Sequence, residues 1–130
     1  MLTNNIIYGA GVLFYSKSIN QTPYFFLGKD LDNKWSNFGG RCEISDKLDP
    51  ETTAARECWE ESLGCVEDFD IIKNSIAKPD VNYILCKTPS GYSYYMYLVK
   101  IPLNNMYRHK FISTKKFISK ISIDKKFLEI

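Results

Sequence analysis

The stretch 39-GGRCEISDKLDPETTAARECWEESLGC-65 contains a complete set of helix signals, and the fold is predicted outward from it. Asp49 is a natural N-cap residue, Pro50 fits the first helical position, and Glu51 complements the positive end of the helix dipole. Gly64 fits the C′ position that follows a helix end. The stretch therefore predicts one helix between Asp49 and Gly64.

Three glutamates of this predicted helix lie on one face. Glu57, Glu60 and Glu61 follow i, i+3, i+4 spacing, at which like charges cost a few tenths of a kcal/mol per pair. Arg56 can pair with Glu60 at i, i+4. A hard cation such as Mg²⁺ would relieve the repulsion, since it prefers oxygen ligands. The spacing alone leaves two interpretations open, a metal site and a solvated acidic helix face.

The rest of the composition indicates one ordinary globular domain over residues 1–130. The chain is 45% hydrophobic with a formal net charge of +2, and no apolar run approaches the ~20 residues of a membrane span. No lysine or arginine precedes Lys17, so we expect no secretory signal. The four cysteines show no metal-ligand spacing, and we expect free thiols, with Cys58 buried, in a cytoplasmic protein.

Charge is distributed unevenly along the chain. Residues 1–70 carry 12 acidic and 6 basic side chains, whereas residues 71–130 carry 3 acidic and 11 basic ones. The first part could hold a cation and the second an anion, although most of the lysines are expected to be a solvated face.

The remaining segments predict a mixed α/β fold. Strands are expected at 6–16 and 23–30, followed by a short strand that ends at Gly39-Gly40. Residues 81–102 are expected to form a hairpin with its turn at 88–91. Residues 104–110 are expected to be a loop. A C-terminal helix is expected to contain Phe117, Ile118, Ile121, Phe127, Leu128 and Ile130.

The segment 39–65 resembles the signature box of the Nudix hydrolases. In that box a glycine, five residues, a glutamate and seven residues precede R-E-U-x-E-E-x-G-U, with U aliphatic. Gly40 supplies the glycine, and 56-RECWEE-61 supplies the core without a gap. The upstream segments GAGVLFY, YFFLGKD and KWSNFGG also look like the strands that lead into the box. The resemblance implies an α/β/α sandwich with a mixed sheet.

Three positions depart from the family pattern. Asp46 stands where the family has glutamate, and nine residues rather than seven separate it from Arg56. Ser62 and Leu63 precede Gly64, one residue more than the pattern allows. These insertions fall outside the glutamate core, so the spacing of the predicted metal-binding face is kept.

The resemblance implies roles for individual residues. Glu57, Glu60 and Glu61 would bind Mg²⁺ or Mn²⁺, with the Gly39 carbonyl as a further ligand. Glu57 would also accept the proton of the attacking water, and Arg56 would position the glutamates. The implied catalytic residues are thus Glu57, Arg56 and Glu61, and the implied reaction is hydrolysis of a diphosphate linked to another group.

Residues outside the box offer fewer signals. A downstream carboxylate could come from Asp80, Asp124 or Glu129, or His109 could act as the base. We favour an exposed loop histidine instead. Arg108, His109 and Lys110 could together bind a phosphate. Tyr92, Tyr94, Tyr95 and Tyr97 could stack a base, but we expect them, and Trp35, to pack in the core.

Two function classes follow. The first is a metal-dependent Nudix pyrophosphohydrolase acting on a capped or triphosphorylated RNA 5′ end, a dinucleoside polyphosphate or a diphosphoinositol polyphosphate. The second is a non-catalytic Nudix-fold module that binds nucleotide or RNA. An acidic helix with no ligand is a third and weaker interpretation. No membrane partner is expected, and homodimerisation stays open because many small family members dimerise.

Overall fold

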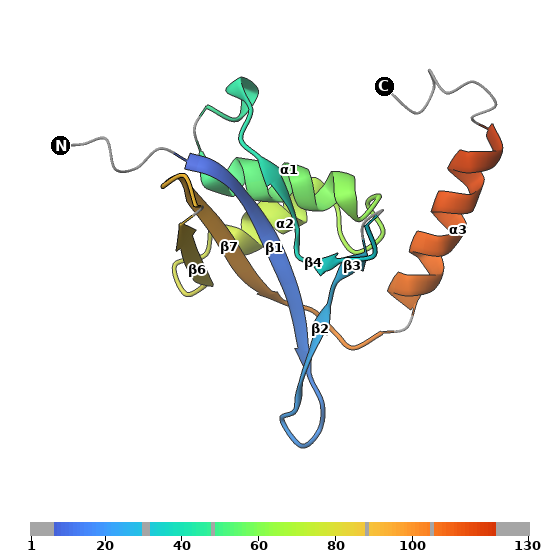
Figure 1. Ribbon diagram of the computed structural model, residues 1–130. Helices are drawn as coiled ribbons and strands as arrows, with labels where there is room; N and C mark the ends of the chain where they lie inside the picture. Colours follow the sequence, from blue (N-terminus) through green and yellow to red (C-terminus); the bar gives the residue numbers. More distant parts are fainter. Residues whose placement is uncertain (1–6, 30–31, 48, 88, 105, 122–130) are drawn as a thin grey trace.

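The computed structural model describes residues 7–29, 32–47, 49–87, 89–104 and 106–121. Its elements are drawn in Figure 1, and their bounds are β1 Ile7–Lys17, β2 Pro23–Phe26, β3 Gly28–Lys29, β4 Trp35–Ser36, β5 Phe38–Arg41, the 3₁₀ helix η2 Ile44–Asp46, α1 Pro50–Glu61, α2 Phe69–Ile76, β6 Asn82–Lys87, β7 Ser93–Lys100 and α3 Met106–Ile121.

The main sheet is mixed, which confirms the predicted α/β fold class. Its order is β2-β1-β7-β6, and β5 pairs with β1 on the same edge as β2. The pair β1–β7 is parallel, and the other pairs are antiparallel. The expected hairpin is β6–β7, with Gly91 at a φ of 89° in its turn. Residue 88 of that turn lies outside the described residues.

The core forms where α1 and α2 pack on one face of the sheet (Figure 1). From β1, Ala10, Val12 and Phe14 point into this core at every second position, as strand geometry requires. The inner face of α1 is made of small residues, which let the helix lie close to the sheet. These residues are Thr53, Ala54, Ala55 and Cys58. The predicted burial of Cys58 is confirmed, and all four cysteines are free.

Helix α1 begins as predicted and ends differently. The Asp49 side chain accepts a hydrogen bond from the Glu51 amide at 3.2 Å, and Pro50 is the first helical residue. The C-cap is Ser62, so Leu63 occupies the left-handed C′ position with a φ of 56°. Gly64 follows at C″, and its amide donates to the Trp59 carbonyl at 2.8 Å. The prediction of Gly64 at C′ was wrong by one residue, because a leucine takes the strained conformation in this Schellman-type end.

The strand predicted at 23–30 is two short strands. β2 ends at Phe26, and β3 leaves the main sheet to pair with β4 as a separate two-stranded ribbon. Trp35 on β4, in this ribbon, is 62% exposed. The prediction that Trp35 packs in the core was therefore wrong. Residue 30 lies outside the described residues.

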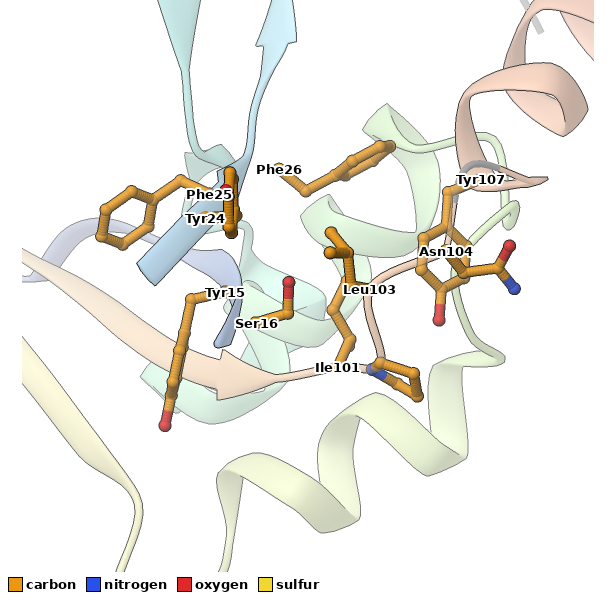
Figure 2. Close-up of a pocket in the computed structure, with 10 residues that line it drawn as sticks. Tyr15, Ser16, Tyr24, Phe25, Phe26, Ile101, Leu103, Asn104 and Tyr107 are labelled. Atoms are coloured by element: carbon orange, nitrogen blue, oxygen red, sulfur yellow. The ribbon is translucent and has the colours of Figure 1, made fainter. Parts of the chain in front are cut away.

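Helix α3 begins at Met106, so the prediction of a loop over 104–110 was wrong for residues 106–110. The Asn104 side chain accepts the Met106 amide hydrogen bond at 2.9 Å and starts the helix. The Tyr107 ring meets the Phe26 ring edge-on at 5.8 Å, beside a cavity of about 60 Å³ (Figure 2). α3 stands beside the sheet rather than over its second face (Figure 1). Phe127, Leu128 and Ile130 lie outside the described residues.

The tyrosine run divides between the two faces of β7. Tyr97 is buried in the core and Tyr95 packs against it, as predicted. Burial raises the pKa of the Tyr97 hydroxyl. Tyr94 lies on the opposite face, and Tyr92 precedes the strand and is 38% exposed. The packing prediction therefore holds for Tyr95 and Tyr97 but not for Tyr92.

Candidate active site

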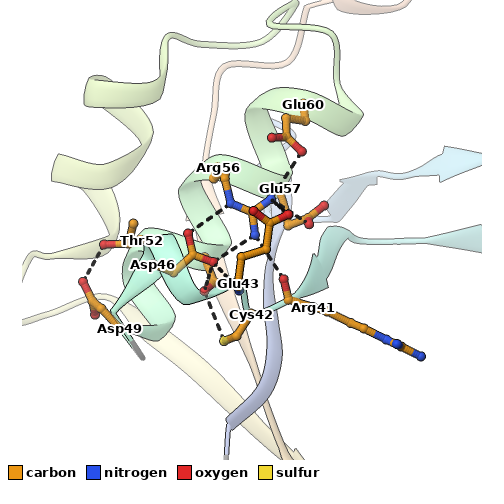
Figure 3. A network of polar contacts seen from close by, with 10 residues as sticks. Arg41, Cys42, Glu43, Asp46, Asp49, Thr52, Arg56, Glu57 and Glu60 are labelled. Atoms are coloured by element: carbon orange, nitrogen blue, oxygen red, sulfur yellow. Dashed lines mark hydrogen bonds and ion pairs between the residues drawn. The ribbon is translucent and has the colours of Figure 1, made fainter. Parts of the chain in front are cut away.

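Arg56 is the centre of the acidic network on α1 (Figure 3). Its Nη1 atom lies 2.9 Å from Glu57 Oε1, 3.3 Å from Glu60 Oε2 and 3.4 Å from Glu43 Oε1. Its Nη2 atom also donates to the Arg41 carbonyl on β5 at 3.0 Å. One guanidinium thus ties the helix to β5 and holds several carboxylates in one place.

Asp46 anchors that guanidinium from the 3₁₀ helix. Its two carboxylate oxygens accept from Arg56 Nε at 3.0 Å and Nη2 at 2.9 Å, in the bidentate geometry that arginine favours. The Thr53 hydroxyl donates to it at 2.8 Å and the Glu43 amide at 2.9 Å. The hydrogen bonds from Arg56 hold the pKa of Asp46 at about 2, below its usual 3.8, although burial opposes them.

Positions 46 and 56 are therefore in contact despite the two-residue insertion before α1. The sequence predicted Glu60 as the partner of Arg56, and that contact exists at 3.3 Å. Asp46 is the closer partner, and it is almost fully buried at 2% exposure. Asp46 and Asp49, the carboxylates at the two ends of this turn, fix the turn that precedes α1.

Glu57 lies against the glycine pair of β5. A Cβ atom placed on Gly40 would lie 2.4 Å from the Glu57 carboxyl carbon, so a side chain there would displace the Glu57 carboxylate. Burial raises the pKa of Glu57, and the hydrogen bond from Arg56 opposes that shift. The carboxylate is thus held between Arg56 and the backbone of β5.

The side-chain position of Gly39 lies on the face of the sheet opposite to α1. In the β1–β5 pairing Gly40 lies opposite Ala10, which points toward α1, whereas Gly39 lies opposite Gly11. A Cβ atom on Gly39 would lie 2.0 Å from the Tyr94 hydroxyl, and one on Gly11 would lie 2.7 Å from it. The two adjacent glycines therefore leave room for two different side chains, Gly40 for Glu57 and Gly39 for Tyr94.

The Tyr94 hydroxyl donates to Asn37 Oδ1 at 3.2 Å. Burial is the main cause that raises its pKa, and the nearby charges of Glu57 and Glu61 add to the shift. Tyr94 thus lies against the same glycine pair as Glu57, and the sequence analysis did not assign it to the site. The glycines at 11 and 39 are the signal that could have revealed it, because side-chain-free positions on a sheet face leave room for a close approach.

Glu60 and Glu61 lie at the exposed end of α1, and the Glu60 side chain is 50% exposed. Glu61 is close enough to Cys58 and Tyr94 to raise the pKa of each. Within the described ranges, no three Asp, Glu, His or Cys side chains are grouped tightly enough to hold a metal ion as they stand. The donors at hand are carboxylate and carbonyl oxygens, a set that suits Mg²⁺ or Mn²⁺, and Mg²⁺ is usually bound through one or two carboxylates and several waters.

The predicted phosphate-binding triplet is not part of this network. Arg108, His109 and Lys110 lie on α3 and are all exposed. Asp80 precedes β6, which β1 and β7 separate from β5, so the fold does not bring it to Glu57. Asp124 and Glu129 lie outside the described residues.

Comparisons with known proteins leave the family undecided. No family model matches the chain, and no curated protein matches it significantly. Among solved structures, the chain is similar to an Ap4A hydrolase from C. elegans, with a TM-score of 0.46 and 19% identity over 75% of this chain and 70% of that one. A binary complex of a C. elegans Ap4A hydrolase gives a TM-score of 0.47 and 18% identity, over 74% of this chain and 68% of that one. The Nudix hydrolase RenU from M. smegmatis gives a TM-score of 0.45 and 10% identity, over 90% of this chain and 89% of that one.

Proposed function

We propose that the chain is a Nudix-type hydrolase that cleaves the diphosphate of a nucleotide-linked or other diphosphate-containing substrate with the help of Mg²⁺ or Mn²⁺. The arrangement of Arg56, Asp46 and Glu57 carries this proposal. Arg56 makes three charge-assisted contacts with the carboxylates of Asp46 and Glu57 beside a glycine pair, and a fourth with the Arg41 carbonyl. A solvated acidic face would need none of these anchors.

The net negative charge of the network around Arg56 supports the proposal that it binds a divalent cation. Four carboxylates, those of Glu43, Asp46, Glu57 and Glu60, lie within 3.4 Å of the single Arg56 guanidinium, which leaves a formal charge of −3. Glu61 adds a further negative charge at the end of the same helix. Such a surplus favours binding of a divalent cation over an empty state.

Glu57, Glu60, Glu61 and the Gly39 carbonyl would hold the metal. When bound, a divalent cation lowers the pKa of water, orients the phosphates and neutralises developing charge. Glu57 would take the proton of the attacking water, whose oxygen bonds to phosphorus while the bridging P–O bond breaks toward the leaving phosphate. Its burial and raised pKa suit this role. Arg56 would position Glu57 and Glu60 rather than contact substrate.

A panel of substrates tests this proposal. Phosphate-containing products are measured with Mg²⁺, with Mn²⁺ and with chelator, using capped RNA, a dinucleoside polyphosphate, ADP-ribose, a nucleoside triphosphate and a diphosphoinositol polyphosphate. Metal-dependent turnover of any one of them is the expected result. No turnover with any of them, by folded protein that binds Mg²⁺, would favour the non-catalytic module.

Among the described residues, none of the helices combines the length and the apolar character that a membrane span requires. A cytoplasmic location and a homodimer stay predictions. Light scattering of the purified chain checks whether it forms a homodimer.

A further inference from the structure

A groove of about 630 Å³ lies between the β3–β4 ribbon and α3. Its volume falls within the usual ~300–1,000 Å³ range of ligand sites. The cations that line it are Lys29 on β3 and Arg108 and Lys115 on α3. No carboxylate is among its lining residues within the described chain. The groove is therefore suited to an anion.

Aromatic surface accompanies these cations. Trp35 is 62% exposed and Phe25 is 56% exposed, and both line the groove. Lys29 lies opposite Trp35 in the β3–β4 pair, and its Nζ atom is 5.5 Å from the centre of the indole ring. An exposed indole beside cations is the combination that binds single-stranded nucleic acid, because bases stack on the ring while the cations meet phosphates.

The basic surface continues beyond the groove along α3. A second hollow on this helix shares Phe111, Ile112 and Lys115 with the groove and extends to Lys120. α3 carries five lysines and arginines and no acidic residue. From Arg108 to Lys120 the helix rises roughly 18 Å. A track of that length favours a polymer over a single mononucleotide.

The groove also borders the strand of the candidate active site. Phe38 lines it, and the next two residues of β5 are Gly39 and Gly40. An RNA chain lying on α3 and stacked on Trp35 would thus reach β5 near the carboxylates of α1.

We propose that the groove and α3 bind single-stranded RNA, so that the substrate of the site is an RNA 5′ end. The second clause rests on the proposed function, whereas the binding of RNA does not. Among the three substrate classes that the sequence leaves open, only the RNA 5′ end is a polymer that would use the whole track.

The test measures binding without catalysis. A 12-nucleotide oligouridylate with a 5′ hydroxyl and a 3′ fluorescein label is titrated with the protein. The buffer contains a metal chelator so that no hydrolysis occurs, and the fluorescence anisotropy of the label reports binding. Three phosphate contacts predict a salt slope near −2, so the affinity should fall about twentyfold between 50 and 200 mM salt. Trp35→Ala should weaken binding at least about fivefold, the lower limit for one stacked base. Lys29→Ala/Lys115→Ala should weaken it and reduce the salt slope.

Matched variants keep the result specific. Lys78→Ala removes an exposed lysine after α2 and should change the affinity less than twofold. In Trp59→Phe, Trp35 is the only tryptophan and its fluorescence should be quenched by the oligonucleotide. In Trp35→Phe, Trp59 reports and should not change.

The failures of the two proposals can be told apart. The proposal that the groove binds RNA is overturned if the oligonucleotide does not bind, or if the groove variants bind it as well as Lys78→Ala does. This holds even if the substrate panel shows turnover. Competition by uridine monophosphate at the same concentration of nucleotide units also overturns it, because the site would then be mononucleotide-sized. Binding in the groove without any metal-dependent turnover would overturn the proposed function and leave the RNA site standing.

Discussion

Arg56 and Arg108 are both helical arginines, yet their surroundings differ completely. Arg56 on α1 contacts four carboxylates and a backbone carbonyl, and its side chain is only 16% exposed. Arg108 on α3 is exposed and lines an open groove without a carboxylate among its described lining residues. The first arginine is fixed before any ligand arrives, whereas the second keeps its charge available to a ligand.

The difference indicates two kinds of surface in one small chain. The acidic region is built from η2, β5 and α1, and its side chains hold one another in place. The basic region is built from the β3–β4 ribbon and α3, and its cations face solvent. Preorganised contacts suit chemistry, where position decides the rate, and exposed cations suit recognition of a polyanion.

The largest expected effect is the loss of hydrolysis in the acidic region. Glu61→Gln should lower kcat by about two orders of magnitude or more, because it removes one carboxylate from the proposed metal site. The free energy of unfolding should stay the same or rise slightly, since repulsion from Glu57 is relieved. Steady-state kinetics and urea denaturation check both parts.

The control for this variant lies on the same helix. Glu51→Gln removes a carboxylate from the first turn of α1, away from the network, and should keep full activity. If Glu61→Gln also kept full activity, the assignment of the site would be wrong.

The two arginines give the next largest effect. Arg56→Ala should cost about 3 kcal/mol of unfolding free energy, because Asp46 would be left buried without its cation. Arg108→Ala should change the free energy by less than about 0.5 kcal/mol, as expected for an exposed position. Urea denaturation of both variants measures the comparison, and equal losses would remove the distinction between the two regions.

The adjacent glycines separate stability from activity. Gly39→Ala would place a Cβ atom 2.7 Å from Gly11 Cα and 2.8 Å from the Ala10 carbonyl oxygen, and should cost about 2 kcal/mol of unfolding free energy. Gly40→Ala meets only the flexible end of Glu57 at its closest contacts, so Glu57 can move aside. The unfolding free energy of Gly40→Ala should therefore change less than that of Gly39→Ala. Its kcat should fall about a hundredfold, because the Glu57 carboxylate is displaced.

Thermal unfolding and steady-state kinetics of both alanine variants make this test. Undiminished activity of Gly40→Ala would show that the position of Glu57 does not matter for the reaction.

A pH dependence of stability, similar in size to the effect of Gly39→Ala, is also expected from the acidic region. The pKa of Asp46 is lowered to about 2 in the folded state from 3.8, so ionised Asp46 stabilises the fold above pH 4. That contribution, about 2 kcal/mol, should be lost as the pH falls from 4 toward 2. Urea denaturation of the wild type and of Asp46→Asn across this range measures it. A parallel fall in both proteins would mean that Asp46 is not its source.

The sequence predicted the acidic region better than the basic one, because the two depend on different distances along the chain. Asp49, Pro50 and the glutamate spacing act within a few residues, so they fixed where α1 begins and which carboxylates share a face. The Arg56–Asp46 contact spans 10 residues, and the helical spacing predicted only Glu60 as the partner of Arg56. Cys58 was placed correctly by helical periodicity alone.

Features that depend on tertiary placement were missed. Trp35 was expected in the core because aromatic composition does not show that β3 and β4 leave the main sheet. The start of α3 depends on the Asn104 side chain, and residues of this kind also favour loops. Tyr94 approaches Gly11 and Gly39 through the register of β1 with β5 and β7, and these glycines indicate a close approach without naming the residue that makes it.

Binding of Mn²⁺ measured by electron paramagnetic resonance tests the central claim most directly, because it needs no substrate. Titration of the wild-type chain should reduce the signal of free Mn²⁺ as the ion binds, and Glu57→Gln/Glu61→Gln should abolish that binding while the protein stays folded. Mg²⁺ should compete with Mn²⁺ at the same site. If the wild type and the double variant bound Mn²⁺ equally, or if neither bound it, the carboxylates of α1 would not be a metal site.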